Sequence, residues 1–213
     1  MSVDRKEWAV PAVTGCGRVR THAPLGAYPD AASAQRREHS PFVQSLNGTW
    51  AFRLTESPDN CPPDFLEPQT ADDEAWLDMP VPSNWQLDDR VPDAPIYTNI
   101  AYPFAGEPPE PPAVNPTGWY RTRFELPEDW TGREVFLLFE SCDSACKVWV
   151  NGQEAGYSQD SKLPHEFNVT AVMRPGSNEL AVMVPRYCDG FWLEDQDYWH
   201  LSGIQRDVTL YSK

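Results

Sequence analysis

The strongest structural signal in this sequence lies in residues 147–157, which read KVWVNGQEAGY. Two strand-like runs, 147–150 and 154–157, flank the dipeptide Asn151-Gly152. Asn-Gly between such runs is the strongest short-range sign of a β-hairpin, because both turn residues must adopt a positive φ. We therefore predict two antiparallel strands joined by a tight turn at this point.

Further strand signals lie on both sides of this hairpin. They are short apolar or alternating runs, at 50–54, 119–126, 135–139, 167–169, 179–184 and 208–211. Helical periodicity is weak throughout, and its best candidate is a turn around Thr70–Leu77. Many short strands without alternating helices predict an all-β fold, an antiparallel β-sandwich or jelly roll.

Two segments lack this pattern. Residues 1–44 show no periodicity and contain four prolines, so we expect an extended N-terminal arm that lies over a surface or stays mobile, followed by one domain over residues 45–213. Residues 92–116 hold eight prolines, which lack the amide hydrogen that helices and inner strands need. This stretch predicts a long loop, and loops of that length within a domain are usually functional.

Charge and cysteine content restrict the possible partners and compartment. The chain has 32 acidic and 17 basic residues, a net charge of −15, which argues against binding to nucleic acid or to an anionic membrane. Its longest apolar runs are far shorter than the roughly 20 residues of a transmembrane helix. Five cysteines at irregular spacing make a poor disulfide framework, and the N-terminus has no signal-peptide pattern, so we expect a cytoplasmic location.

Two polar clusters are candidates for binding chemistry. Residues 156–164 end a strand in short polar groups that could bind hydroxyls or a hard cation. Residues 192–199 alternate carboxylates with large aromatic residues, a composition that suits a carbohydrate. Glu194 and Asp197 could form a glycosidase acid and nucleophile pair, although their spacing fixes no geometry outside a helix. The alternative is a solvated acidic loop that buried aromatic residues hold in place.

A set of motifs in fixed order resembles a known family. They are Ser45-Leu46-Asn47-Gly48, Val81-Pro82-Ser83-Asn84-Trp85-Gln86, Ala94-Pro95-Ile96-Tyr97-Thr98-Asn99, Asn115-Pro116-Thr117-Gly118, the run 150–167, and the run 193–208. Together they closely resemble the N-terminal sugar-binding jelly roll of the large β-galactosidases of glycoside hydrolase family 2. The resemblance covers residues 45–213, and residues 1–44 resemble less closely the arm that helps to assemble the subunits of these enzymes.

The resemblance implies roles for individual residues. The catalytic glutamates of the family lie on a later (β/α)₈ barrel, so no catalytic residue is expected here. Asn99 matches an Asn that contacts galactosyl hydroxyls, and Ile100 would line the same pocket. Asp160 matches an Asp that ligates sodium and bonds the sugar, whereas the segment 194–199 becomes more architectural than catalytic. Galactosides and the remaining domains or subunits of the enzyme are the implied partners.

The sequence also departs from the family pattern. Gly17 precedes Arg18 where the family has an Asn that helps to bind a structural magnesium, which puts a magnesium site in doubt. Cys188 and Phe191 replace small polar residues before Leu193.

Three functions remain open at this point. The first is the sugar-binding domain of a retaining β-galactosidase, inactive by itself. The second is a free-standing carbohydrate-binding module, and the third is a subunit-assembly domain.

Overall fold

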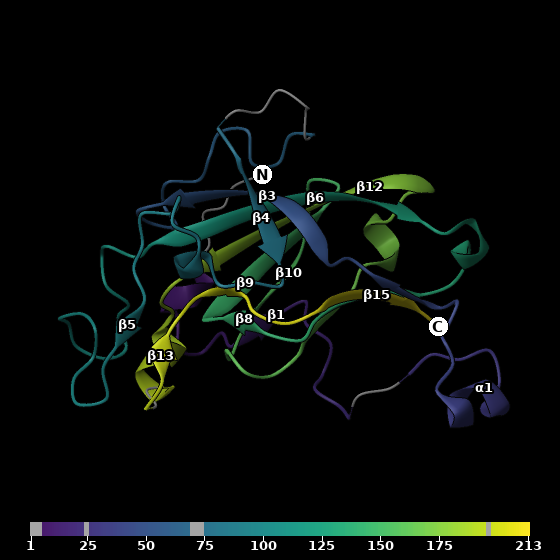
Figure 1. Cartoon of the computed structure of the whole chain (residues 1–213), viewed down its shortest axis with the longest axis horizontal. Helices are drawn as coiled ribbons and strands as arrows, with labels where there is room; N and C mark the ends of the chain where they lie inside the picture. The colour runs from purple at the N-terminus through teal and green to yellow at the C-terminus, as the bar shows by residue number, and fades with distance from the viewer. Residues whose placement is uncertain (1–5, 24–25, 69–74, 195–196) are drawn as a thin grey trace.

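The computed structural model describes residues 6–23, 26–68, 75–194 and 197–213. Figure 1 shows the course of the chain. The described strands are β1 (Gly15–Cys16), β2 (Val43–Ser45), β3 (Gly48–Thr55), β4 (Leu77–Val81), β5 (Ile96–Tyr97), β6 (Thr117–Leu126), β7 (Val135–Phe139), β8 (Cys142–Asp143), β9 (Ala145–Val150), β10 (Gln153–Gln159), β11 (His165–Asn168), β12 (Gly176–Pro185), β13 (Trp199–His200), β14 (Gly203–Ile204) and β15 (Val208–Ser212). The helical elements are α1 (Ala31–Arg36) and the 3₁₀ turns η1 (Glu7–Ala9), η2 (Trp85–Leu87), η3 (Glu128–Trp130), η4 (Thr170–Val172) and η5 (Asp189–Leu193).

The strands form two main antiparallel sheets, which confirms the prediction of an all-β sandwich. Seven strands pair in the order β1-β10-β9-β12-β6-β3-β4, and four pair in the order β11-β7-β15-β2. Two smaller pairs, β13-β5 and β14-β8, complete the fold. Asn151 and Gly152 have φ values of 52° and 75°, so the predicted hairpin between β9 and β10 is present.

The space between the two sheets is filled by apolar side chains that alternate along the strands. Val135, Leu137 and Phe139 of β7 point inward from the smaller sheet, and Val148 and Val150 of β9 meet them from the larger one. Residues 135–139 were visible in the sequence as a short apolar run, and residues 147–150 as a run that leads into the Asn-Gly turn. The predicted turn at Thr70–Leu77 falls largely on residues 69–74, which lie outside the described part of the chain.

The outer face of the seven-stranded sheet carries a second apolar cluster. Trp119 and Trp149 project from it, and Phe65 packs edge-on against both rings at centroid distances of 4.7 and 5.3 Å. Trp8 from the N-terminal segment belongs to the same cluster. Next to it, buried Lys147 donates to both carboxylate oxygens of Glu7, at 3.1 and 3.0 Å.

The N-terminal segment is therefore built into the described fold. It runs extended over the surface, as predicted, where β1 pairs with the edge strand β10. It also contains a short helix, α1, that the sequence reading missed. Asp30 caps this helix by accepting from the Ser33 amide at 2.8 Å, and Arg37 ends it in the left-handed conformation.

The proline-rich loop 92–116 is held by aromatic contacts at one end of the sandwich. The Tyr102 hydroxyl donates to the Trp192 carbonyl at 2.6 Å, and the Trp192 indole donates to the Glu110 carbonyl at 3.1 Å. Phe191, which departs from the family pattern, packs against Phe104 and Tyr187 at 5.8 and 4.8 Å. A bulky residue at this position therefore fills the aromatic cluster.

None of the described helices is long and apolar enough to cross a membrane. All five cysteines are free, and Cys142, Cys146 and Cys188 are buried. Burial raises the pKa of the Cys188 thiol to about 12. Burial also raises the pKa of the Cys142 thiol, so Cys142 and Cys188 act as packing groups at neutral pH.

Candidate sugar-binding edge

Asn99 and Ile100 lie in an exposed turn just after β5. This short strand pairs with β13, and the ring nitrogen Nε2 of His200 lies 3.2 Å from the Thr98 carbonyl. The Thr98 hydroxyl donates to the Ala101 carbonyl at 2.8 Å, which closes the turn. Ile100 is 96% exposed. Figure 1 shows β5 and β13 together at one end of the molecule, opposite α1.

Asp160 follows β10 and starts a turn of its own. Its φ is +98°, and its Oδ1 accepts from the amides of Lys162 and Leu163 at 3.2 and 3.3 Å. An aspartate that accepts from the backbone two and three residues ahead is a common turn former. These two hydrogen bonds to the Asp160 carboxylate therefore stabilise its own loop.

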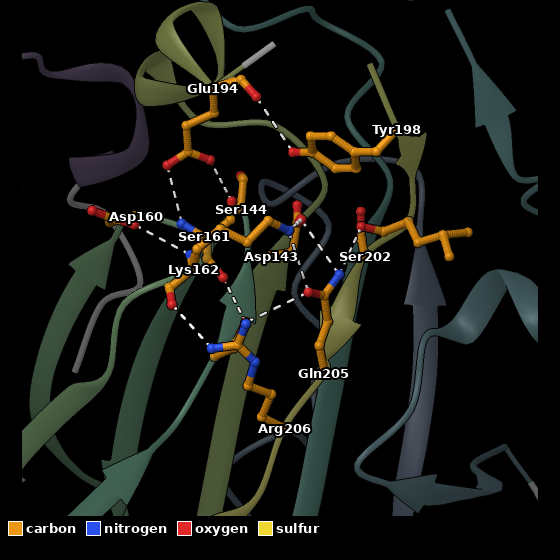
Figure 2. A network of polar contacts seen from close by, with 12 residues as sticks. Asp143, Ser144, Asp160, Ser161, Lys162, Glu194, Tyr198, Ser202, Gln205 and Arg206 are labelled. Atoms are coloured by element: carbon orange, nitrogen blue, oxygen red, sulfur yellow. Dashed lines mark hydrogen bonds and ion pairs between the residues drawn. The ribbon is translucent and has the colours of Figure 1, made fainter. Parts of the chain in front are cut away.

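Glu194 fastens the acidic-aromatic segment 194–200 to this turn, as Figure 2 shows. One carboxylate oxygen accepts from the Ser161 amide at 3.0 Å, and the other accepts from the Ser161 hydroxyl. Burial raises the pKa of Glu194, and the two bonds from Ser161 act against that rise. Both oxygens are occupied, so the geometry gives Glu194 a holding role, in line with an architectural segment.

A second group of polar contacts surrounds Lys162, the residue after Ser161. Lys162 donates to buried Asp143 at 3.0 Å, and Gln205 donates to the same carboxylate oxygen at 3.4 Å. Burial raises the pKa of Asp143, while Lys162 acts to lower it. The Lys162 ammonium also lies 4.9 Å from the centre of the Tyr198 ring, and its backbone carbonyl accepts from Arg206 at 3.2 Å. The sequence reading missed this group around Lys162.

The segment 194–200 also contacts the turn that holds Asn99. The Tyr97 hydroxyl donates to the Asp197 carboxylate, and the Tyr97 and Trp199 rings lie 5.7 Å apart. Glu194 and Tyr198 therefore contact the turn of Asp160, while Asp197 and Trp199 contact Tyr97, two residues before Asn99. The carboxylate that touches the Asn99 side of this arrangement is Asp197 rather than Asp160.

The described residues offer little that could hold a metal unaided. They contain no group of three or more His, Cys, Asp or Glu side chains placed to bind one ion. Gly17, where the family has an Asn, has a φ of +68°, and a Cβ there would lie 2.4 Å from the Ala155 carbonyl oxygen. A side chain at this position would require the backbone to move.

Comparisons with known proteins agree with the resemblance. A family model described as "Glycosyl hydrolases family 2, sugar binding domain" matches residues 43–213. The β-galactosidase of Psychromonas ingrahamii is 47% identical over 211 residues, which cover 99% of this chain and 20% of that protein. A β-galactosidase of Enterobacter cloacae is 46% identical over 210 residues, with 98% and 20% covered. The chain thus spans about a fifth of the length of these relatives.

Solved structures support the fold. The β-glucuronidase of Bifidobacterium dentium matches with a TM-score of 0.59 and 20% identity, over 80% of this chain and 29% of that one. A β-glucuronidase of Bacteroides uniformis matches with a TM-score of 0.58 and 24% identity, over 80% and 18%. At this identity the likeness concerns the fold alone.

Proposed function

The chain belongs to the glycosyl hydrolase family 2 sugar-binding domains, and on that premise we propose that it serves a larger β-galactosidase as one wall of its galactoside cleft. The match to β-galactosidases over nearly the whole chain supports this function above a free-standing module or a pure assembly domain. The groups that cut the glycosidic bond would lie in the remaining four-fifths of such an enzyme.

The end that holds β5 and β13 is the part we propose for this wall. Ile100 is 96% exposed, and Trp199, which is 57% exposed, lies 5.7 Å from the ring of Tyr97, two residues before Asn99. Large apolar side chains gathered on one surface usually mark a contact with a ligand or another domain. In the proposed arrangement the Asn99 amide bonds sugar hydroxyls, while Ile100 supplies apolar surface to the pocket.

Sodium is the ion we propose for the intact enzyme, with a carboxylate of this edge as one ligand. Asp160 is the residue that the resemblance implies. Asp197 is the rival, because it lies against Tyr97 in the group that contacts the Asn99 turn. Oxygen ligands suit a hard cation, and a carboxylate beside the cation could also orient a sugar hydroxyl. The other ligands would come from outside this chain.

A chimaeric enzyme tests the proposal. The matching fifth of the Enterobacter cloacae β-galactosidase is replaced by this chain, and hydrolysis of a chromogenic β-galactoside is measured. We expect activity, and we expect Asn99→Ala to raise KM or lower kcat by about tenfold, the usual cost of one lost buried hydrogen bond. Asp129→Asn, at an exposed carboxylate in η3, is the control and should change nothing. A chimaera that assembles but stays inactive would exclude the proposed function.

Sodium titration of the same chimaera separates the two carboxylates. The variant that loses its sodium response, Asp160→Asn or Asp197→Asn, identifies the ligand. Unchanged sodium dependence in both would remove the proposed metal role from this chain.

The isolated chain tests the alternatives. Calorimetric titration with galactose should show no binding below millimolar concentrations, because half of the pocket is missing. Sub-millimolar affinity would support a free-standing module, and hydrolysis above the buffer rate would contradict the expectation that the chain is inactive alone.

A further inference from the structure

The N-terminal segment crosses the edge of the smaller sheet beside β11. Arg18 forms a β-bridge with Phe167, and the Val19 amide donates to the Glu166 carbonyl at 2.8 Å. Glu166 is a buried residue, and its side chain points to the outer face of the sheet, where His22 meets it. The contact of His22 with Glu166 is therefore the one that holds the end of the described stretch 6–23 against the sheet.

Both ring nitrogens of His22 face oxygen atoms that can only accept. Nδ1 lies 2.7 Å from the Ala23 carbonyl. Nε2 lies 3.3 and 3.2 Å from the two carboxylate oxygens of Glu166. A neutral imidazole has one N–H, so one nitrogen would present a lone pair to an oxygen, whereas an imidazolium donates to both. The geometry therefore fits the protonated ring alone.

We propose that His22 is a proton-dependent clamp, which in its protonated form fastens residues 20–23 to Glu166 on β11 and in its neutral form releases them. The device acts on the N-terminal segment and is independent of the sugar-binding edge. It does not require the proposed function to hold.

The charged groups around His22 come from several elements. Glu166 belongs to β11, and Tyr211 of β15 also forms a hydrogen bond with that carboxylate. Glu140 and Arg206 line the same cavity of about 300 Å³ as His22, and Lys213 lies near enough to oppose its charge. The pKa of His22 is nevertheless raised above 6.5, first by the Ala23 carbonyl and then by Glu166.

The direction of the pH effect follows from the upward shift of the His22 pKa. A histidine whose pKa is higher in the folded than in the unfolded state stabilises its contact fully below pH 6.5. The contribution is lost as the pH rises through the raised value. The clamp should therefore be closed below pH 6.5 and should open as the pH rises through the raised pKa of His22, while Arg18 and Val19 keep the preceding residues attached.

Two measurements on the full 213-residue chain test the clamp. In an NMR titration of the histidine rings, His22 should titrate above 6.5, and Glu166→Gln should lower its midpoint. A His22 midpoint at or below 6.5, or one that Glu166→Gln leaves unchanged, would overturn the proposal.

The second measurement follows the segment itself. The rate of trypsin cleavage after exposed Arg20 is measured across pH 5.5–8.5. This rate is divided by the cleavage rate of a free peptide of residues 15–25 in the same buffers, which corrects for the pH dependence of trypsin itself. We expect the ratio to rise several-fold through the His22 midpoint. In His22→Gln this ratio should be high at every pH, at the level that the unmodified chain reaches only when His22 is neutral. His39→Gln, in the same segment, should show the same pH profile as the unmodified chain. An identical pH profile for His22→Gln and the unmodified chain would contradict the clamp.

Discussion

His165 is a buried histidine whose charge state is set first by burial and then by Arg18. Arg18 donates to the Ser158 hydroxyl at 2.9 Å, and that hydroxyl lies 2.6 Å from Nδ1 of buried His165. Arg18 can only donate, so it occupies one lone pair of the hydroxyl and leaves the hydroxyl hydrogen available to donate to an unprotonated Nδ1. Burial, followed by the charge of Arg18, lowers the pKa of His165 to about 4.

We predict that His165 makes the fold sensitive to acid. Its pKa is about 4 in the folded chain and near 6.5 in the unfolded chain, so the unfolded state binds the extra proton between these values. Stability should fall by about 3 kcal/mol as the pH drops from 7 to 4 on account of this residue. Urea unfolding at several pH values should show that His165→Gln loses this part of the pH dependence and that His39→Gln keeps it. Equal slopes in the unmodified chain and His165→Gln would contradict the assignment.

At the scale of elements, strands with a self-contained pattern were predicted well. The run 135–139 is β7 to the residue, and the Asn151-Gly152 turn joins β9 and β10 as expected. These strands alternate or lie in the core, so their own residues specify them. The pairs β5-β13 and β8-β14 are only two residues long, and their partners lie about 60 to 100 positions away. No local pattern can reveal such elements.

The candidate site likewise contains residues that the sequence could identify and residues that it could not. The turn of Asn99 and Ile100 could be named from a motif, because the motif is continuous in the sequence. The group of Asp143, Lys162 and Gln205 could not, since its members come from three separate segments that only the folded sheets bring together. The roles of Asn99, Ile100 and Asp160 stay predictions.

The β1–β10 pair gives a prediction at this scale. A Cβ on Gly156 would lie 2.3 Å from the Cys16 carbonyl oxygen and 2.9 Å from the Phe167 ring. Gly156→Ala should therefore push β1 off the sheet, cost about 1–3 kcal/mol, and speed amide hydrogen exchange at Gly15 and Cys16. Gly152→Ala is the control, since it meets open space and should cost only about 1 kcal/mol for its positive φ. Unchanged exchange at β1 in Gly156→Ala would show that the pairing tolerates a side chain.

On the scale of the whole molecule, the seven-stranded sheet is covered on both faces. The smaller sheet covers one face, while Trp8 and Glu7 from the N-terminal segment cover part of the other. The sequence predicted an extended arm over residues 1–44, because these residues have no period of their own. The apolar anchor Trp8 and the charged anchor Glu7 are isolated residues whose partners lie about 40 to 140 positions away, so periodicity could not show them. The division at residue 45 remains a prediction.

The Glu7–Lys147 ion pair allows a test of how firmly the N-terminal segment is anchored to the seven-stranded sheet. Lys147 is fully buried, and besides Glu7 it has Glu154 at 3.5 Å. Glu7→Gln removes both short bonds to the buried ammonium and leaves it only the partly exposed carboxylate of Glu154, so we expect a loss of about 3 kcal/mol in the free energy of unfolding by urea. Lys6→Gln removes the exposed pair with Asp59, which is 2.7 Å long, and should cost less than about 1 kcal/mol.

A double variant separates the ion pair from simple packing. Glu7→Gln combined with Lys147→Met removes the stranded charge, and apolar replacement of a buried pair is often neutral. We therefore expect the double variant to recover most of the stability that Glu7→Gln loses. If Glu7→Gln costs no more than Lys6→Gln, the N-terminal segment is not anchored through this pair, and the layer over the sheet is held by Trp8 and the β1 pairing instead.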